Sequence, residues 1–230
     1  MKVFQVRLKL YLLKDIAVSQ MQEKLTSLID KGFAVSESML QMHEDNRFKN
    51  YCYDMPYPVE KDKVYKRGKV YTLTIRTIDI GLARYFSDVC VNSYTDSLKA
   101  LTSEVRIIPQ KFIQSIYTLT PAILKGDKGY WRGCMTMEEY EERMKVNLIK
   151  KWNAFENEKM DENFQLYIFM EFLNKVPIMM EYKGIKLWGD KFSLQIADNA
   201  SAQKLAYMSL GTGILEMNSR GAGFVSYKWL

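Results

Sequence analysis

The sequence predicts an α+β protein built from two tandem ferredoxin-like domains, each with the element order βαββαβ. Apolar and polar residues alternate over residues 4–12, which is the period of a strand with one buried face. Over residues 16–33 the apolar residues change to helical spacing, and Gly32 supplies a stop signal. A chain of 230 residues with 47% hydrophobic content is long enough for two small cores.

The first half of the chain continues this order. Residues 50–54 can form a short strand, and residues 71–75 alternate again as a half-buried strand. Residues 105–108 begin another extended segment. Asp79 can cap a second helix, whose apolar stripe is Leu82, Phe86, Val89 and Cys90. The resulting order, strand, helix, strand, strand, helix, strand, is the split βαβ arrangement.

The second half is expected to be a less regular copy of the first. Thr136 and Glu139 form a capping box for a charged helix over residues 137–157. Its glutamates and lysines, Lys150 and Lys151 among them, are interpreted as a solvated face with i,i+4 pairs. The other expected segments are a stretch at 118–125, a helix or strand at 163–173, strands at 178–182 and 191–196 joined through Gly184 and Gly189, a helix at 202–210 and a strand at 224–229.

No linker rich in Gly, Ser or Pro separates the two halves. We therefore expect an N-terminal domain of residues 1–118 to pack directly against a C-terminal domain of residues 119–230. No apolar run approaches the roughly 20 residues needed to span a bilayer, and charges interrupt the first residues. These features predict a cytoplasmic protein with no membrane contact.

Composition narrows the possible chemistry. Lys and Arg number 33 against 27 Asp and Glu, which gives a net charge of +6 and favours a polyanionic partner. Three distant cysteines without a CxxC pair argue against a disulfide framework or a thiolate metal site. A single histidine, His43, excludes a His-rich metal centre and any mechanism that needs two imidazoles. We expect neither a metal nor a cofactor.

The most specific local feature is a glycine-rich segment near the C-terminus. Gly211 and Gly213 precede a polar turn that contains Arg220, and Gly221 and Gly223 follow it. Glycines permit close backbone approach, so amide N–H groups can converge on an anion, and a guanidinium suits phosphate. Alternatively, the glycines only relieve steric crowding in a turn. The segment follows a helix and precedes a strand, which is the reverse of the dinucleotide-binding order.

Several stretches together resemble the repeat-processing endoribonucleases of CRISPR systems, the sixth Cas family within the repeat-associated mysterious proteins. The C-terminal KLAYMSLGTGILEMNSRGAGFVSY is similar to the family's terminal signature, and YKGIKLWGDKFSLQIAD resembles the stretch before it. HEDNRFKNYCYDMPYP and YKRGKVYTLTIRT resemble the family's N-terminal block. The resemblance covers most of the chain and is weakest over residues 119–175. It implies two ferredoxin-like domains and a CRISPR repeat RNA as the partner.

The resemblance also implies a catalytic site. A histidine after the first helix and a nearby lysine carry the family's chemistry, which places His43 and Lys49 in these roles. An imidazole can act as base or acid near neutral pH, and an ammonium can neutralise charge on the scissile phosphate without a metal. The ribose 2′-hydroxyl is then the nucleophile, and the expected products are a 2′,3′-cyclic phosphate and a 5′-hydroxyl. Many relatives have a tyrosine where this chain has Leu28, so the third catalytic role is unassigned, with Tyr51, Tyr53 and Ser38 as substitutes.

Basic and aromatic residues before the glycine-rich segment suit phosphate contacts and base stacking. The candidate RNA-binding residues are Lys191, Lys204, Gly211, Gly213, Arg220, Gly221 and Gly223. Two other functions stay open: a non-catalytic RNA-binding subunit of a CRISPR effector complex, and a ferredoxin-like protein with no RNA role. Other effector subunits are possible partners, and the chain is expected as a monomer or homodimer.

Overall fold

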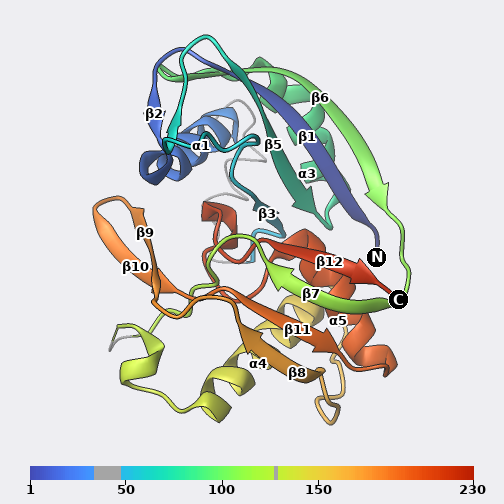
Figure 1. The fold of residues 1–230 in the computed structure, drawn as a ribbon. Helices are drawn as coiled ribbons and strands as arrows, with labels where there is room; N and C mark the ends of the chain where they lie inside the picture. The colour runs from blue at the N-terminus through green and yellow to red at the C-terminus, as the bar shows by residue number, and fades with distance from the viewer. Residues whose placement is uncertain (34–47, 127–128) are drawn as a thin grey trace.

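The computed structural model describes residues 1–33, 48–126 and 129–230, and it contains two four-stranded antiparallel sheets (Figure 1). The first sheet has the strand order β3-β5-β1-β6, and the second has β12-β7-β11-β8. In each sheet the first and third strands of the unit lie side by side in the middle, which is the ferredoxin-like order. Both expected βαββαβ domains are therefore confirmed.

The N-terminal domain contains the expected elements in the expected order, and its last strand begins at Leu98, earlier than the expected residue 105. Alternation produces β1, whose inward residues Val6, Leu8 and Leu10 are fully buried. Asp79 caps α3 as expected, with its carboxylate accepting from the backbone N–H groups of Gly81 and Leu82. The elements are β1 (Val3–Leu12), β2 (Ile16–Ala17), α1 (Val18–Phe33), β3 (Tyr51–Tyr53), β4 (Val64–Tyr65), β5 (Val70–Thr77), α3 (Ile80–Arg84), η1 (Tyr85–Val89), η2 (Cys90–Asn92) and β6 (Leu98–Ile108).

The C-terminal domain contains the expected long helix. Its capping box is formed in both directions between Thr136 and Glu139, and Asn157 ends it in the left-handed conformation. Residues 163–173, which fitted helix or strand, contain a strand. The elements are β7 (Ile113–Thr118), η3 (Trp131–Gly133), α4 (Met137–Glu156), β8 (Tyr167–Phe172), β9 (Ile178–Tyr182), β10 (Ile185–Gly189), β11 (Phe192–Ile196), α5 (Ala200–Thr212), η4 (Asn218–Arg220) and β12 (Val225–Trp229).

Three expectations for this domain need correction. The segment expected to be extended at residues 118–125 is not a strand, because β7 ends at Thr118, Pro121 has no N–H for a ladder, and only isolated bridges follow it. Since β7 belongs to the second sheet, the chain changes domain before residue 113 and not at the expected 118/119 boundary. The strands at 178–182 and 191–196 are not joined by a simple connection, because a further strand, β10, lies between them and forms a separate hairpin with the first.

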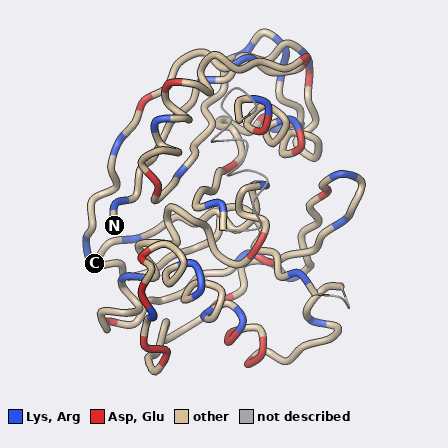
Figure 2. Tube along the Cα trace, turned by 180° about the vertical axis from the view of Figure 1, so that it is seen from behind, with Lys and Arg blue, Asp and Glu red and all other residues tan. Residues whose placement is uncertain are grey.

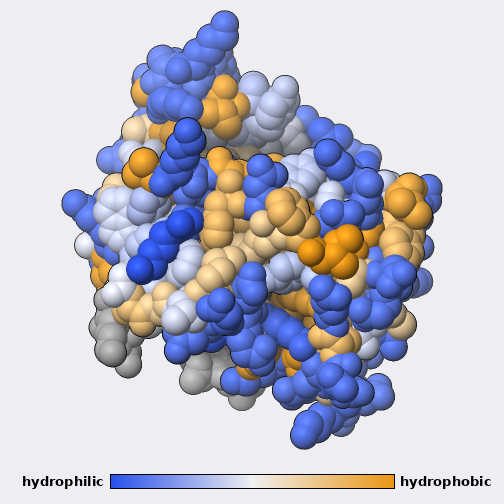
Figure 3. All heavy atoms as spheres, turned by 60° about the horizontal axis from the view of Figure 1, so that its bottom comes forward, coloured by the Kyte–Doolittle hydropathy of each residue, from blue (hydrophilic) through white to orange (hydrophobic). Residues whose placement is uncertain are grey.

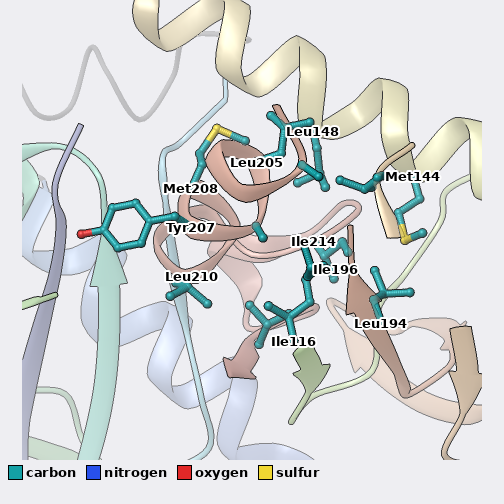
Figure 4. Packing of buried hydrophobic residues seen from close by; sticks show 14 of the residues in the cluster. Ile116, Met144, Leu148, Leu194, Ile196, Leu205, Tyr207, Met208, Leu210 and Ile214 are labelled. Carbon is teal, nitrogen blue, oxygen red and sulfur yellow. The ribbon is translucent and has the colours of Figure 1, made fainter. Parts of the chain in front are cut away.

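Each domain has its own core. One cluster of buried apolar residues lies between α1, the α3 region and the first sheet, and the other lies between α4, α5 and the second sheet. Figure 4 shows the second core, where Leu148 of α4 lies beside Leu205 of α5. Burial of apolar surface contributes about 25 cal/mol per Å², so these two cores supply most of the favourable free energy of folding.

Buried polar contacts join the two domains. Arg76 of β5 donates from Nε to the Gln5 side chain at 3.0 Å and from a terminal nitrogen to the Val225 carbonyl at 2.7 Å. Its guanidinium also lies 4.6 Å from the centre of the Phe224 ring. The Tyr207 hydroxyl of α5 donates to the Ile108 carbonyl at 2.6 Å. These contacts fix the strand β12 and the glycine-rich segment before it against the N-terminal sheet.

None of the helices in the described parts of the chain has the length and apolar character that a membrane crossing requires. On the face of the molecule seen in Figure 3, hydrophobic side chains lie in patches between hydrophilic ones. Within the C-terminal domain, the edge strand β8 exposes Ile168 and Phe169.

Candidate functional site

A cavity of about 660 Å³ lies where the two domains meet at the glycine-rich segment. The N-terminal domain contributes residues 48–51, which lead into β3. The C-terminal domain contributes Lys125, one side of α4, and residues 215–220, which connect α5 to β12. Asn147, Lys151 and Ala154 face the cavity from α4 at helical spacing. Basic side chains from both domains thus line one cavity.

Of the two predicted catalytic residues, only Lys49 lies in the described part of the chain. His43 lies outside the described residues, as does Ser38. Lys49 lines the cavity together with Arg220 of the glycine-rich segment, so the structure brings these two predicted site residues together. Leu28, at the position where the resemblance implied a tyrosine, is fully buried in the N-terminal core and does not line the cavity.

Of the two described substitutes for that tyrosine, Tyr51 is the better placed. It lines the cavity, and its hydroxyl reaches the Ser219 carbonyl at a long 3.5 Å. Burial raises the pKa of Tyr51 well above its usual value, and Arg220 partly opposes this shift. Tyr51 therefore keeps its proton near pH 7. The Tyr53 hydroxyl instead shares a 2.7 Å hydrogen bond with Thr26 in the protein interior.

Arg220 is held in an ion pair with the N-terminal domain. One of its terminal nitrogens lies 2.8 Å from each carboxylate oxygen of Asp30 in α1, and its guanidinium lies 5.3 Å from the centre of the Tyr182 ring. Asp30 raises the pKa of Arg220 against the opposing effect of burial. The residue expected to hold phosphate thus also braces the glycine-rich segment against α1.

The four glycines of the segment have steric reasons for their positions. A Cβ on Gly211 would lie 2.8 Å from the Ile78 side chain, and one on Gly221 would lie 2.4 Å from the Gln22 amide. Gly213 and Gly223 both have positive φ, and a Cβ on either would meet the Asn218 amide nitrogen, at 2.5 and 2.9 Å. These glycines allow close packing around Asn218 and against the N-terminal domain.

Much of the segment's backbone is already hydrogen bonded within the protein. The N–H of Ile214 donates to the Gly223 carbonyl at 2.9 Å, and the N–H of Gly223 donates to the Pro121 carbonyl at 2.9 Å. The N–H groups of Glu216 and Gly221 donate to carbonyls of Ile123 and Asn218. An anion would therefore meet the part of the segment that lines the cavity, residues 215–220, and not the buried glycines themselves.

Lys151 is a site residue that the sequence did not reveal. Its place in a charged helix predicted a solvated face, but it is only 3% exposed. Its ammonium donates to the carbonyls of Gly213 at 3.1 Å and Leu215 at 2.8 Å, and to the Asn218 side chain at 2.7 Å. Burial lowers the pKa of Lys151 to about 7, with Cys52 and Glu216 opposing the shift. Lys151 corrects the expectation of a uniformly solvated face, because this side of α4 packs against the segment.

The two other predicted RNA-binding lysines lie elsewhere. Lys191 is partly buried beside β11, and burial lowers its pKa while Asp54 opposes the shift. Lys204 is exposed on α5, with its ammonium 5.7 Å from the centre of the Trp152 ring. Neither lines the cavity. Figure 2 shows further basic residues along the β9–β10 hairpin, which carries Lys183 and Lys186.

The described residues contain no group of three or more His, Cys, Asp or Glu side chains that could hold a metal ion. Cys52 and Cys90 are buried free thiols, and Cys134 is an exposed one.

The protein is of the class with two ferredoxin-like domains and a glycine-rich segment, which here belongs to the second domain and packs against the first. Several solved structures have a similar fold. Solved structures titled "An RAMP protein binding different RNA substrates" and "Characterization of a Cas6-related gene from Pyrococcus furiosus" superpose with TM-scores of 0.73 and 0.71. Their identities are 15% and 14%, over 98% of this chain and 99% and 98% of theirs. A third, titled "CRISPR associated protein Cas6", is 19% identical with a TM-score of 0.67, over 98% of this chain and 99% of its own.

The family described as "CRISPR associated protein Cas6, C-terminal" matches residues 103–227, which is more than half of the chain. The protein therefore belongs to the Cas6 family. No curated protein matches the sequence.

Proposed function

We propose that this protein is an endoribonuclease that cuts CRISPR precursor RNA within its repeats, without a metal ion. The observation that carries the proposal is the cavity, because Lys49 and Tyr51, which follow the segment with His43, line it together with residues 215–220. Membership of the Cas6 family supports RNA as the substrate. One similar structure, with a TM-score of 0.65 and 16% identity, is titled a Cas6 product complex.

The proposed chemistry uses the nucleophile of the substrate itself. The 2′-hydroxyl next to the scissile phosphate attacks the phosphorus, its proton passes to a base, and the 5′ oxygen leaves with a proton from an acid. His43 supplies the base or the acid, and Lys49 stabilises the charge that develops on the phosphorane. Tyr51 is the proposed substitute for the missing tyrosine, because it lines the cavity and its hydroxyl lies 3.5 Å from the carbonyl of Ser219, another lining residue. The products are a 2′,3′-cyclic phosphate and a 5′-hydroxyl.

The proposal is tested with synthetic repeat RNA under single-turnover conditions. Cleavage is expected to persist in EDTA and to stop when the attacking nucleotide is 2′-deoxy. His43→Ala and Lys49→Ala are expected to lower the rate constant by about 10²- to 10⁴-fold, and Tyr51→Phe by less. The exposed Lys61, outside the cavity, gives the control variant Lys61→Ala, which should cleave normally. A requirement for Mg²⁺, or cleavage of the deoxy substrate, would contradict the mechanism.

A second function, a non-catalytic RNA-binding subunit, is favoured by one observation. Leu28 is fully buried where many relatives have a catalytic tyrosine. Comparison of wild type with His43→Ala separates the two functions. An enzyme loses cutting in the variant and keeps binding, whereas a binding subunit shows no cutting by either protein.

A further inference from the structure

The interior of the glycine-rich segment is built around two buried polar side chains, those of Lys151 and Asn218. Lys151 enters from α4, and its three ammonium protons meet three oxygen acceptors of residues 213–218. Two of these acceptors are backbone carbonyls, of Gly213 and Leu215, and the third is the side-chain oxygen of Asn218. A lysine ammonium has three donors, so this arrangement satisfies all of them.

Asn218 completes the arrangement from inside the segment. Its amide nitrogen donates to the carbonyls of Ile214 and Ala222, both at 3.0 Å. The side chain therefore joins both arms of the turn while its oxygen accepts from Lys151. The absence of a Cβ at Gly213 and Gly223 makes room for this amide, since a Cβ at either position would collide with it. The GxG units of the motif thus enclose a polar side chain.

A purely structural role would not need a charge here. The neighbours of Lys151 on α4, Leu148 and Ile149, are buried apolar residues. Burying a charge is unfavourable unless it is fully hydrogen bonded, and apolar residues of similar volume are often at least as stabilising as buried ions. An ammonium, unlike an apolar group, forms directional hydrogen bonds. Those to the carbonyls of Gly213 and Leu215 fix the backbone conformation of the turn.

We propose that Lys151 and Asn218 are positioning residues that hold the glycine-rich segment in the shape that presents residues 217–220 to the RNA. Lys151 donates from α4 to the Asn218 side chain, and Ser219 and Arg220, the next two residues of the same turn, line the cavity with them. Neither positioning residue is assigned a chemical step. The inference rests on the proposed function for its effect on cleavage, but the arrangement of the segment can be measured without RNA.

The first experiment measures hydrogen exchange by mass spectrometry on the full chain without RNA. Lys151→Met keeps the length of the side chain and removes the donors. We expect exchange in peptides covering residues 211–224 to accelerate by about tenfold or more, while peptides from β1 and β5 stay unchanged. The adjacent Lys150 is exposed, and Lys150→Met is the matched control that should leave exchange as in wild type. Unchanged exchange in Lys151→Met would overturn the proposal.

The second experiment measures single-turnover cleavage and the Kd for repeat RNA with Lys151→Met, Asn218→Ala and the double variant. Misplaced residues 217–220 are expected to lower the rate constant by about 10- to 100-fold and to change the Kd by less than about threefold. Because the two residues act as a unit, the double variant should be no slower than the slower single variant. If the rate reductions of the two single variants multiply in the double variant, the two residues do not act together. A change in Kd as large as the change in rate constant would show that the pair only supports binding.

Two controls keep the outcomes separate. If wild type does not cut the RNA, the proposed function fails, and hydrogen exchange alone still decides whether the pair orders the segment. If Lys151→Met does not fold, as judged by circular dichroism, the same measurements on Asn218→Ala decide, because that variant leaves the ammonium two of its three acceptors.

Discussion

Arg220 has two possible roles that its contacts make distinguishable. It lines the cavity, and it also forms a two-oxygen contact with Asp30 of α1. Arg220→Ala removes both roles, whereas Asp30→Ala removes only the brace and leaves the guanidinium in place. The pair is partly exposed, so the contribution of the ion pair to stability is expected to be modest, about 1 kcal/mol.

We predict that Arg220→Ala weakens repeat RNA binding at least about tenfold and lowers the salt slope of the Kd by about one, because a phosphate contact is lost. Asp30→Ala should keep that slope and lower mainly the cleavage rate. Filter-binding titrations at several salt concentrations measure both. Equal effects of the two variants on the salt slope would mean that Arg220 only braces the segment.

The sequence singled out Arg220, which lines the cavity, but gave no signal for Lys151, which lines it too. A lysine beside Lys150 in a helix rich in glutamate matches a solvated face. Its burial depends on how α4 lies against residues 213–218, which come about 60 residues later in the chain. Arg76 was hidden in the same way, because its position in an alternating strand does not show that a second domain covers it.

At the scale of elements, the turn between α5 and β12 depends on its glycines. Gly213 has a φ of +73°, and an added Cβ would lie 2.5 Å from the Asn218 amide nitrogen and 3.0 Å from the Gly223 carbonyl oxygen. With a ψ of 172° this is a positive-φ extended conformation, which costs a non-glycine residue about 1–3 kcal/mol, and the collision adds to this. Gly133 differs on both counts, because a Cβ added there would meet no atom within 4 Å and its φ is not positive.

Gly213→Ala is therefore predicted to lower the free energy of unfolding by about 2–4 kcal/mol, and to slow cleavage because the turn is displaced. Gly133→Ala should change stability by less than about 0.5 kcal/mol. Urea denaturation followed by circular dichroism measures the difference. Similar stabilities of the two variants would show that the turn tolerates a side chain and that its glycines are not sterically required.

The elements themselves followed the sequence wherever local signals were complete. The capping box at Thr136 and the cap at Asp79 fixed two helix starts, and alternation fixed β1 and β5. The β9–β10 hairpin was missed because β10 lies at residues 185–189, in the stretch whose glycines predicted a connection between two strands. Local periodicity cannot show which strands pair, since pairing depends on residues distant in the sequence.

At the scale of the whole molecule, Arg76 connects the two domains. It is 7% exposed and donates to Gln5 in its own sheet and to Val225 in the other domain. Burial lowers the pKa of Arg76, and it remains charged at neutral pH. Removal of the guanidinium leaves a buried carbonyl without its donor, which is more unfavourable than the loss of an exposed hydrogen bond.

We predict that Arg76→Met lowers the free energy of unfolding by about 2–4 kcal/mol and broadens the transition as the domains uncouple. The exposed Arg84 of α3 provides the control variant Arg84→Met, which should unfold like wild type. Calorimetry, or urea denaturation followed with probes in both domains, measures the free energy of unfolding and the width of the transition. Wild-type stability in Arg76→Met would show that apolar contacts alone hold the domains together.

The sequence by itself determined the two βαββαβ domains, the strands and most helix starts, and the segments that carry the family's motifs. These features rest on periodicity, caps and glycine positions, which act over a few residues. Only the tertiary structure decided that Lys49, Tyr51 and residues 215–220 share one cavity, and that Lys151 lies buried beneath the turn. Those relations depend on how two separately folded cores pack together, and contacts between residues far apart in the sequence leave no periodic signal within it.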